Sequence, residues 1–308
     1  MELLWFIPTH GDGRYLATAI GGRDLITSLN KIRAIIHKYY FMRTKSLYKC
    51  LYKLSPWGLP ILLIIIWQFS VQFNWISPRL LPTPTNVILA GIRLAKSGEL
   101  FYHIGISTKR AAIGFSIGGS IAFVLGLLNG VIPWAENLLD TSIQMLRNIP
   151  HLAMIPLVIL WFGVGEEGKI FLVALGVLFP IYINTFHGIR TVDPKLIEMG
   201  KVYGLNAWSL FWQIVLPSAM PSILVGVRYA LGVMWLTLIV AETIVFDSGI
   251  GYMAMNAREF LQTDVVVLSI LLYAILGKLA DMSARYLEKK WLSWHPGYQQ
   301  ISPQTFRR

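Results

Sequence analysis

The sequence predicts an all-α, polytopic membrane protein with about six transmembrane helices. Of the 308 residues, 55% are hydrophobic and only 14% are charged, whereas soluble domains carry charge on about a quarter of their residues. Long charge-free stretches recur along the chain, and a helix needs about 20 apolar residues to cross a bilayer. Eleven Trp and thirteen Tyr suit two membrane interfaces, where amphipathic rings settle.

Each predicted span is an apolar run bounded by charges. The first lies between Lys53 and Arg79, and it begins too deep in the chain and runs too long to be a cleaved signal peptide. The second follows Arg110. The last two contain charged residues, which are costly in lipid and are therefore expected to face protein or water. The six spans are predicted near residues 57–76, 111–132, 139–162, 170–189, 222–245 and 265–285.

The net charge of +11 is concentrated at the two ends of the chain. Nine of the 27 Lys and Arg residues precede residue 54, and five more lie from Arg285 onward. Basic flanks of apolar spans stay in the cytoplasm, so six spans place both termini inside. The loop 77–109, on the predicted outer side, also carries four basic residues, which weakens this bias without outweighing the amino-terminal tail. No nucleic-acid-reading motif accompanies the charge, so no nucleic acid is expected as a partner.

Residues for catalysis, metal binding or ATP binding are not arranged in usable patterns. Cys50 is the only cysteine, and the six His show no metal-ligand spacing, so no cofactor or metal is expected. Residues 163–170, GVGEEGKI, nearly spell a phosphate-binding loop, but Ile170 stands where Ser or Thr must hold Mg²⁺. The chain is therefore predicted to be no enzyme, and any ATP would be hydrolysed by a separate subunit.

Small residues recur on the second predicted span. Gly114, Gly118, Gly126 and Gly130 make two GxxxG spacings, which let helix backbones approach closely in lipid. The pattern is compatible with packing inside the chain and with a contact between two copies.

The most informative stretch is residues 197–223, which is typical of two short helices joined at a bend. Asp193-Pro194 starts the first helix, and Gly204 can end it in a left-handed conformation. The second helix, NAWSLFWQIV, carries more apolar and aromatic surface than a helix exposed to water needs. It suits the groove of a protein partner, or alternatively a position on lipid headgroups. Pro217 and Pro221 are expected to stop and redirect the chain into the fifth span.

This stretch resembles the EAA loop of ABC-importer permeases, whose pattern is EAA, three residues, Gly, nine residues and Ile-x-Leu-Pro. Met199 and Gly200 stand where the family has two alanines, and the spacing holds throughout. The matching positions are Glu198, Gly204, Ile214, Leu216 and Pro217. In that family the loop is the coupling helix that docks in a cleft of the ATPase subunit.

The resemblance extends from about residue 55 to residue 298. Over this length the chain resembles the permeases of aliphatic sulfonate importers, most specifically in LLDTSIQMLRNIPHLAMIPLVILWFG, GVRYALGVMWLTLIVAET and GIGYMAMNAREFLQTDVVV. Taurine, nitrate, bicarbonate and pyrimidine-precursor permeases belong to the same wider group. The resemblance implies a type I ABC importer transmembrane domain in the bacterial inner membrane, surrounded by lipid. It also implies a homodimer, two ABC ATPase subunits, an extracytoplasmic solute-binding protein and a small anionic substrate.

Polar residues at membrane depth are candidates for the translocation path. Arg147, Asn148 and His151 precede the apolar run of the third span, and Glu242 lies near the outer end of the fifth. An anion would favour Arg147 and be repelled by Glu242. The alternative for each residue is a hydrogen bond that holds the bundle together. Three further charged residues, Arg228, Lys278 and Asp281, are interpreted as a structural cluster at the inner end of the bundle.

The predicted domains are a cytoplasmic tail at 1–55, a transmembrane domain at 56–290 with its coupling loop at 191–219, and a cytoplasmic tail at 291–308. Residues 4–22, LWFIPTHGDGRYLATAIGG, resemble the start of alkanesulfonate monooxygenase, a (β/α)8 barrel. A barrel needs about 250 residues, so this fragment cannot form an active site. A gene fusion, a truncated neighbouring gene and chance similarity remain as explanations.

Two other functions compete with the importer. An ion-coupled secondary transporter predicts acidic relays and inverted repeats, but Glu242 is the one plausible relay and the EAA-like loop has no second copy. A bifunctional oxygenase fails on domain length.

Overall fold

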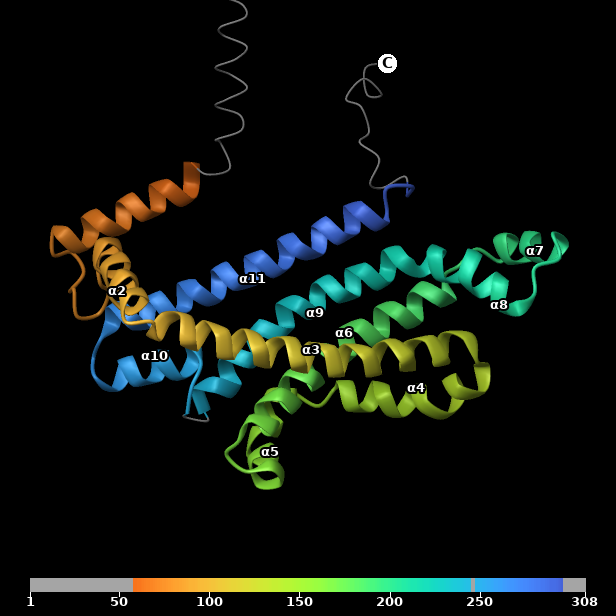
Figure 1. Cartoon of the computed structure of the whole chain (residues 1–308), viewed down its shortest axis with the longest axis horizontal. Coiled ribbons are helices and arrows are strands. Elements are labelled where there is room, and N and C mark those ends of the chain that lie inside the picture. Colours follow the sequence, from red (N-terminus) through yellow and green to blue (C-terminus); the bar gives the residue numbers. More distant parts are fainter. Residues whose placement is uncertain (1–57, 245–246, 296–308) are drawn as a thin grey trace, which may run out of the picture. The chain divides into compact units, whose positions relative to one another are not determined.

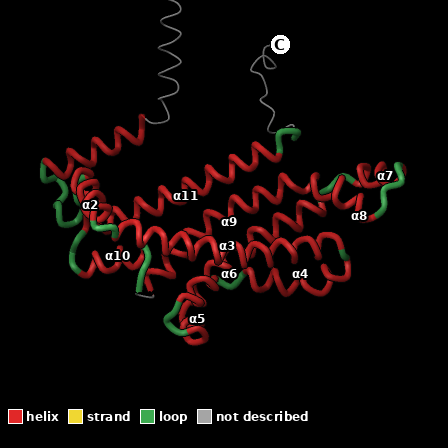
Figure 2. Tube along the Cα trace, in the orientation of Figure 1, coloured by secondary structure: helices red, strands yellow, loops and turns green. Residues whose placement is uncertain are grey.

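The computed structural model of the protein describes residues 58–244 and 247–295 (Figure 1). Within these ranges every regular element is helical, which confirms the all-α prediction (Figure 2). The 4–22 fragment, Cys50 and most of the predicted carboxyl-terminal tail lie outside the described residues. The chain divides into the units Met1–Phe69 and Ser70–Arg308, and the bundle described below belongs to the second.

Within the described residues, four helical runs are long and apolar enough to cross a membrane. They contain the second, fourth, fifth and sixth predicted spans. Helix α3 begins at Glu99, about three turns before residue 111, because His103, Ser107 and Arg110 are buried against neighbouring helices and need no lipid contact. The four runs are α3 (Glu99–Val131), α6 (Glu166–Arg190), Ala207–Ile244, which includes α9 (Leu216–Ile244), and α11 (Thr263–Trp291).

The other two predicted spans differ from single long helices. In place of 139–162 the chain forms α4 (Pro133–Arg147), a 3₁₀ turn (His151–Met154) and α5 (Ile155–Phe162), with 78° between α4 and the run Leu152–Phe162. Pro150 explains the break, because it has extended backbone angles, lacks an N–H and disfavours helical geometry in the residue before it. The first predicted span corresponds to a shorter apolar helix, Gly58–Gln72.

Helix α6 lies between α3 and α9 and forms the centre of the bundle (Figure 1). The glycine stripe of α3 faces α6. A Cβ on Gly118 would lie 2.2 Å from the carbonyl oxygen of Ala174, and one on Gly126 would lie 2.7 Å from Thr185. The close-packing glycines of the GxxxG pattern therefore serve contacts inside this chain.

The two ends of the bundle carry different elements (Figure 1). Helices α7 (Pro194–Val202) and α8 (Ala207–Leu210) lie at the start of α9, and α10 (Ile250–Glu259) lies at its far end. Helix α2 (Pro84–Lys96) packs beside α11, and Thr83 caps its first turn.

The charges inside the last two spans pair with each other, as the sequence predicts. Asp281 on α11 accepts from Arg228 Nε of α9 at 2.7 Å and from Arg285 Nε at 2.9 Å, and Lys278 Nζ lies 3.8 Å from it. The Arg228–Asp281 pair joins α9 to α11, and the other two pairs lie within α11, so these charged groups contact protein partners.

Candidate functional site

The predicted bend in the 191–219 loop is present. Asp193 caps α7 by accepting from the N–H of Lys195 at 2.9 Å. Gly204 has φ +78°, which confirms the predicted left-handed glycine. The N–H of Leu205 donates to Gly200 O and that of Gly204 donates to Lys201 O, each at 3.0 Å. This pair of bonds is a Schellman motif, so the bend is a defined hydrogen-bonded structure.

Gly200, a position where the sequence departs from the family pattern, lies at the contact between the two short helices. A Cβ there would lie 2.6 Å from both Leu210 Cδ1 and Ile214 Cδ1. Ile214, one of the matched positions, is half-buried at this contact. The glycine therefore lets the arm after the bend fold closely back on α7.

One face of the bend is apolar and exposed. Its side chains are 47% to 86% exposed, and the Trp208 and Trp212 rings meet edge to face with centroids 5.6 Å apart. Glu198 is also exposed, whereas Leu216 is buried at the start of α9. A surface of this kind is suited to a partner's groove. The exposed apolar residues are Met199, Val202, Tyr203, Trp208 and Trp212.

The two prolines after the bend do not stop the chain. Residues Ala207–Ile244 form one helical run, so the expected stop at Pro217 and Pro221 is wrong. A π turn at Phe211–Val215, in which Leu216 N–H bonds to Phe211 O, widens the helix just before Pro217. Pro217 follows this π turn inside the continuous run. The arm after the bend is thus continuous with a membrane-spanning helix.

The path candidates fall in two separate places. Arg147 and Asn148 are exposed at the end of α4, and His151 begins the 3₁₀ turn that follows. Glu242 is fully buried near the end of α9, among residues from α3, α10 and α11. The structure therefore groups the first three residues and sets Glu242 apart.

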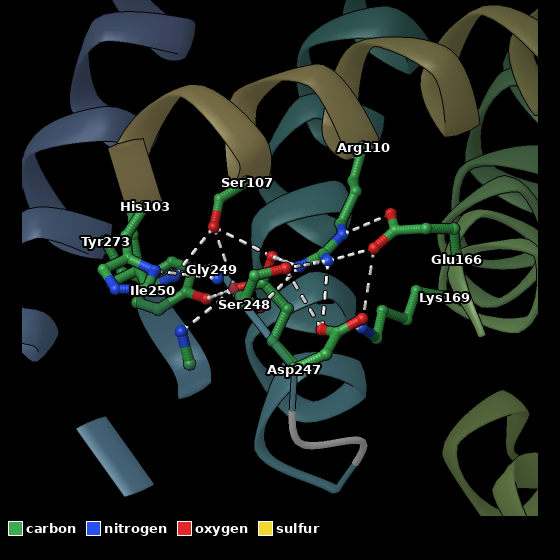
Figure 3. Close-up of polar contacts among 12 residues, drawn as sticks. His103, Ser107, Arg110, Glu166, Lys169, Asp247, Ser248, Gly249, Ile250 and Tyr273 are labelled. Atoms are coloured by element: carbon green, nitrogen blue, oxygen red, sulfur yellow. Dashed lines mark hydrogen bonds and ion pairs between the residues drawn. The ribbon is translucent and has the colours of Figure 1, made fainter. Parts of the chain in front are cut away.

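Glu242 belongs to a polar cluster around Arg110 of α3, and Figure 3 labels Arg110 with several of the other members. Arg110 Nη1 donates to Glu242 Oε1 at 2.8 Å and to the carbonyl of Ser248 at 2.6 Å. Its Nε donates to Glu166 Oε2 at 2.7 Å, and its Nη2 lies 3.2 Å from Asp247 Oδ1. The Arg110–Glu242 pair is fully buried, so removing Glu242 would cost about 3–5 kcal/mol, because the buried Arg110 charge loses this partner.

The Glu242 carboxylate is held by neutral donors as well. Ser107 Oγ donates at 2.8 Å, Tyr273 OH at 2.9 Å and the N–H of Gly251 at 3.0 Å. These groups come from α3, α11 and α10, so one carboxylate joins four helices. With Arg110 as a fourth donor, Glu242 is fully satisfied and has no capacity left for a passing solute.

Lys169 completes the charged cluster. Its ammonium is buried and lies 2.5 Å from Asp247 Oδ1 and 3.8 Å from Glu166 Oε1. Burial raises the pKa of Asp247, but the hydrogen bond and charge of Lys169 and the charge of Arg110 outweigh it, and the net pKa lies below its usual value. Asp247 is therefore ionised at neutral pH. We call Arg110, Lys169, Glu166, Glu242 and Asp247 the Arg110 cluster.

Comparison with known proteins decides the family. Residues 114–293, more than half of the chain, match the family described as binding-protein-dependent transport system inner membrane component. The chain belongs to this family.

Two bacterial relatives of this inner-membrane component carry the same name. A protein named as an aliphatic sulfonates transport permease, SsuC, of Escherichia coli K12 is 62% identical over 81% of this chain and 95% of its own length. The protein of that name from Bacillus subtilis 168 is 47% identical over 78% and 87%. The taurine transport system permease TauC of E. coli K12 is 32% identical over 77% and 88%.

A solved structure shows the fold of this permease. The crystal structure of an amino acid ABC transporter with histidines superposes with a TM-score of 0.50 at 14% identity, covering 65% of this chain and 96% of that one. The family match and the relatives over 30% identical show that this chain is a multi-pass membrane component of a transport system.

Sequence reasoning missed most of the Arg110 cluster in this permease. Glu166 and Lys169 lie in the segment rejected as a phosphate loop, and Arg110 served only to mark the end of a charge-free run. A usable signal was present: these residues and Asp247 all flank spans at the same predicted end of the bundle. Basic residues on that side are disfavoured, which points to acidic partners.

Gly249→Ala is expected to destabilise this permease by about 3 kcal/mol, because it overpacks a buried ionic site. Gly249 has φ +106°, and a Cβ would lie 2.4 Å from the Glu242 carboxylate oxygens. Thermal unfolding in detergent checks the effect. Gly163→Ala is the control, since Gly163 also has a positive φ (+72°) but open space around it, and strain alone costs about 1–2 kcal/mol. Equal losses in the two variants would contradict the packing argument.

Proposed function

We propose that this chain is the permease subunit of an ATP-driven importer of aliphatic sulfonates. It works as a homodimer with two ATPase subunits and an extracytoplasmic solute-binding protein, and both termini lie in the cytoplasm. The transmembrane domain spans 56–290, between cytoplasmic tails at 1–55 and 291–308. The bend at Gly204 carries the proposal, because it pairs a matched family motif with an exposed apolar face.

The bend suits transmission of force from an ATPase. Its apolar face, centred on Trp208, offers aromatic anchors to a groove. The Schellman motif at Gly204 and the Gly200 contact hold the two arms as one body. Because the second arm continues into α9, a displacement of the bend moves a spanning helix directly. Closure of two ATPases would thus bring two bends together and turn the bundle from inward-open to outward-open.

The substrate class comes from the E. coli and B. subtilis relatives, whose names specify aliphatic sulfonates. Taurine is a second candidate, because a taurine permease is also similar, at lower identity. Both compounds carry a sulfonate group, and taurine carries an ammonium group as well, so the two assignments share one headgroup chemistry.

Deleting the gene is expected to abolish uptake of labelled ethanesulfonate and growth on it as the sulfur source. Restoring the wild-type gene should restore both, and growth on sulfate serves as the control. Competition by excess taurine in the restored strain separates the two substrates. Unchanged ethanesulfonate uptake after deletion would remove the substrate assignment, while copurification of a soluble ATPase would still test the transporter class.

A further inference from the structure

The Arg110 cluster is layered by charge. The two cations are buried, with side-chain exposures of 2% for Arg110 and 1% for Lys169. Two of the three carboxylates cover them from the solvent side, at 50% exposure for Glu166 and 43% for Asp247. The half-exposed acids therefore form a cap over the buried bases, and solvent can reach this cap.

The charges balance for one added anion. Glu242 is fixed by four donors and neutralises one of the two cations, which leaves Arg110 and Lys169 with an excess of one positive charge. Glu166 and Asp247 together carry two negative charges, so the whole cluster has a net charge of −1. Replacing both carboxylates by a single monoanion would make the cluster neutral.

We propose that Arg110 and Lys169 form an anion site that takes the sulfonate headgroup of the solute, with Glu166 and Asp247 as competing internal ligands. This inference rests on the proposed function and adds the place where the solute first meets the permease. Glu242 lies near the end of α9 that is far from the bend, so the site is at the predicted outer side; Figure 1 shows the two ends of α9.

The donor geometry suits a tetrahedral headgroup. Turning Glu166 and Asp247 outward frees Arg110 Nε, part of its Nη2 and Lys169 Nζ, while Nη1 stays with Glu242 and the Ser248 carbonyl. Three sulfonate oxygens can accept from these three nitrogens. Glu166 is the first residue of α6 and Asp247 lies in the loop before α10, so neither needs to unwind a helix to turn away.

The test measures binding of ethanesulfonate to the full-length chain, purified with its ATPase subunits, by thermal stabilisation at constant ionic strength. Ethyl methyl sulfone, which is similar in shape but uncharged, is the ligand control. Glu166→Gln and Asp247→Asn should each tighten ethanesulfonate binding at least about fivefold, since a like charge is removed from the site. Lys169→Met should abolish it.

One matched control variant and three possible results test the proposed site. Asp264→Asn removes a carboxylate from the exposed Arg93 pair at the same end of the bundle and should leave binding unchanged. Equal ethanesulfonate affinity in wild type, Glu166→Gln and Asp247→Asn would overturn the site. So would stabilisation by glycerophosphoglycerol, a soluble lipid headgroup, without stabilisation by ethanesulfonate. The third outcome is that the purified protein does not bind ethanesulfonate although cells still need the chain for ethanesulfonate uptake. This result would refute the site but not the proposed function.

Discussion

Gly118→Ala is expected to destabilise the bundle by about 3 kcal/mol, at the upper end of overpacking costs. The added Cβ would lie 2.2 Å from Ala174 O and 2.7 Å from Ala174 Cα. Both atoms are backbone, so no side-chain rotation can relieve the clash and α3 must move away from α6. A lower thermal unfolding temperature in detergent, with less folded protein in the membrane, is the expected result.

The same helix provides the control. Gly105 lies on α3 with nothing near the position of an added Cβ, so Gly105→Ala should leave stability unchanged or slightly raised, because alanine favours a helix. Similar losses in both variants would show that the α3–α6 contact is not the cause.

Gly204→Val is expected to reduce sulfonate uptake about tenfold or more while the protein still inserts and folds. A left-handed conformation costs an L-residue roughly 1–2 kcal/mol, and a branched Cβ adds to this cost, so the population of the bent state falls at least about tenfold. No neighbouring atom lies within 4 Å of an added Cβ, so the effect comes from the backbone alone. Uptake assays and copurification of the ATPase subunit measure it.

Gly204→Asn is the matched control, because asparagine tolerates the left-handed region and should keep most of the uptake. Normal ATPase copurification and normal uptake in Gly204→Val would contradict the coupling role of the bend. Loss of membrane insertion in both variants would instead indicate a folding role.

The sequence predicted local features well because they depend on neighbouring residues. The Asp193 cap and the left-handed Gly204 follow from short-range hydrogen bonding and backbone sterics, and both are present. The positions of the spans were predicted from the length of apolar runs, and this prediction was wrong at Pro150 and at the start of α3. The two failures have different causes. Pro150 cannot continue a helix, whereas the burial of His103, Ser107 and Arg110 against other helices allows polar residues at the start of α3 that lipid would exclude.

The Arg110 cluster could not be assembled from the sequence. Arg110, Glu166 and Glu242 lie on three helices, and their pairing depends on how α3, α6 and α9 cross. For Glu242 the sequence left two interpretations open, a residue on the translocation path and a hydrogen bond that holds the bundle together. In the folded chain four donors satisfy its carboxylate.

The amino-acid sequence by itself determined the helical membrane class, the family motif and the bend, because these are set by composition and by spacing along one segment. Only the tertiary structure decided that the α3 glycines face α6, that the arm after the bend continues into α9, and that buried cations lie under exposed acids. Each of these depends on contacts between segments distant in sequence, whose pairing is fixed by packing and charge compensation in three dimensions.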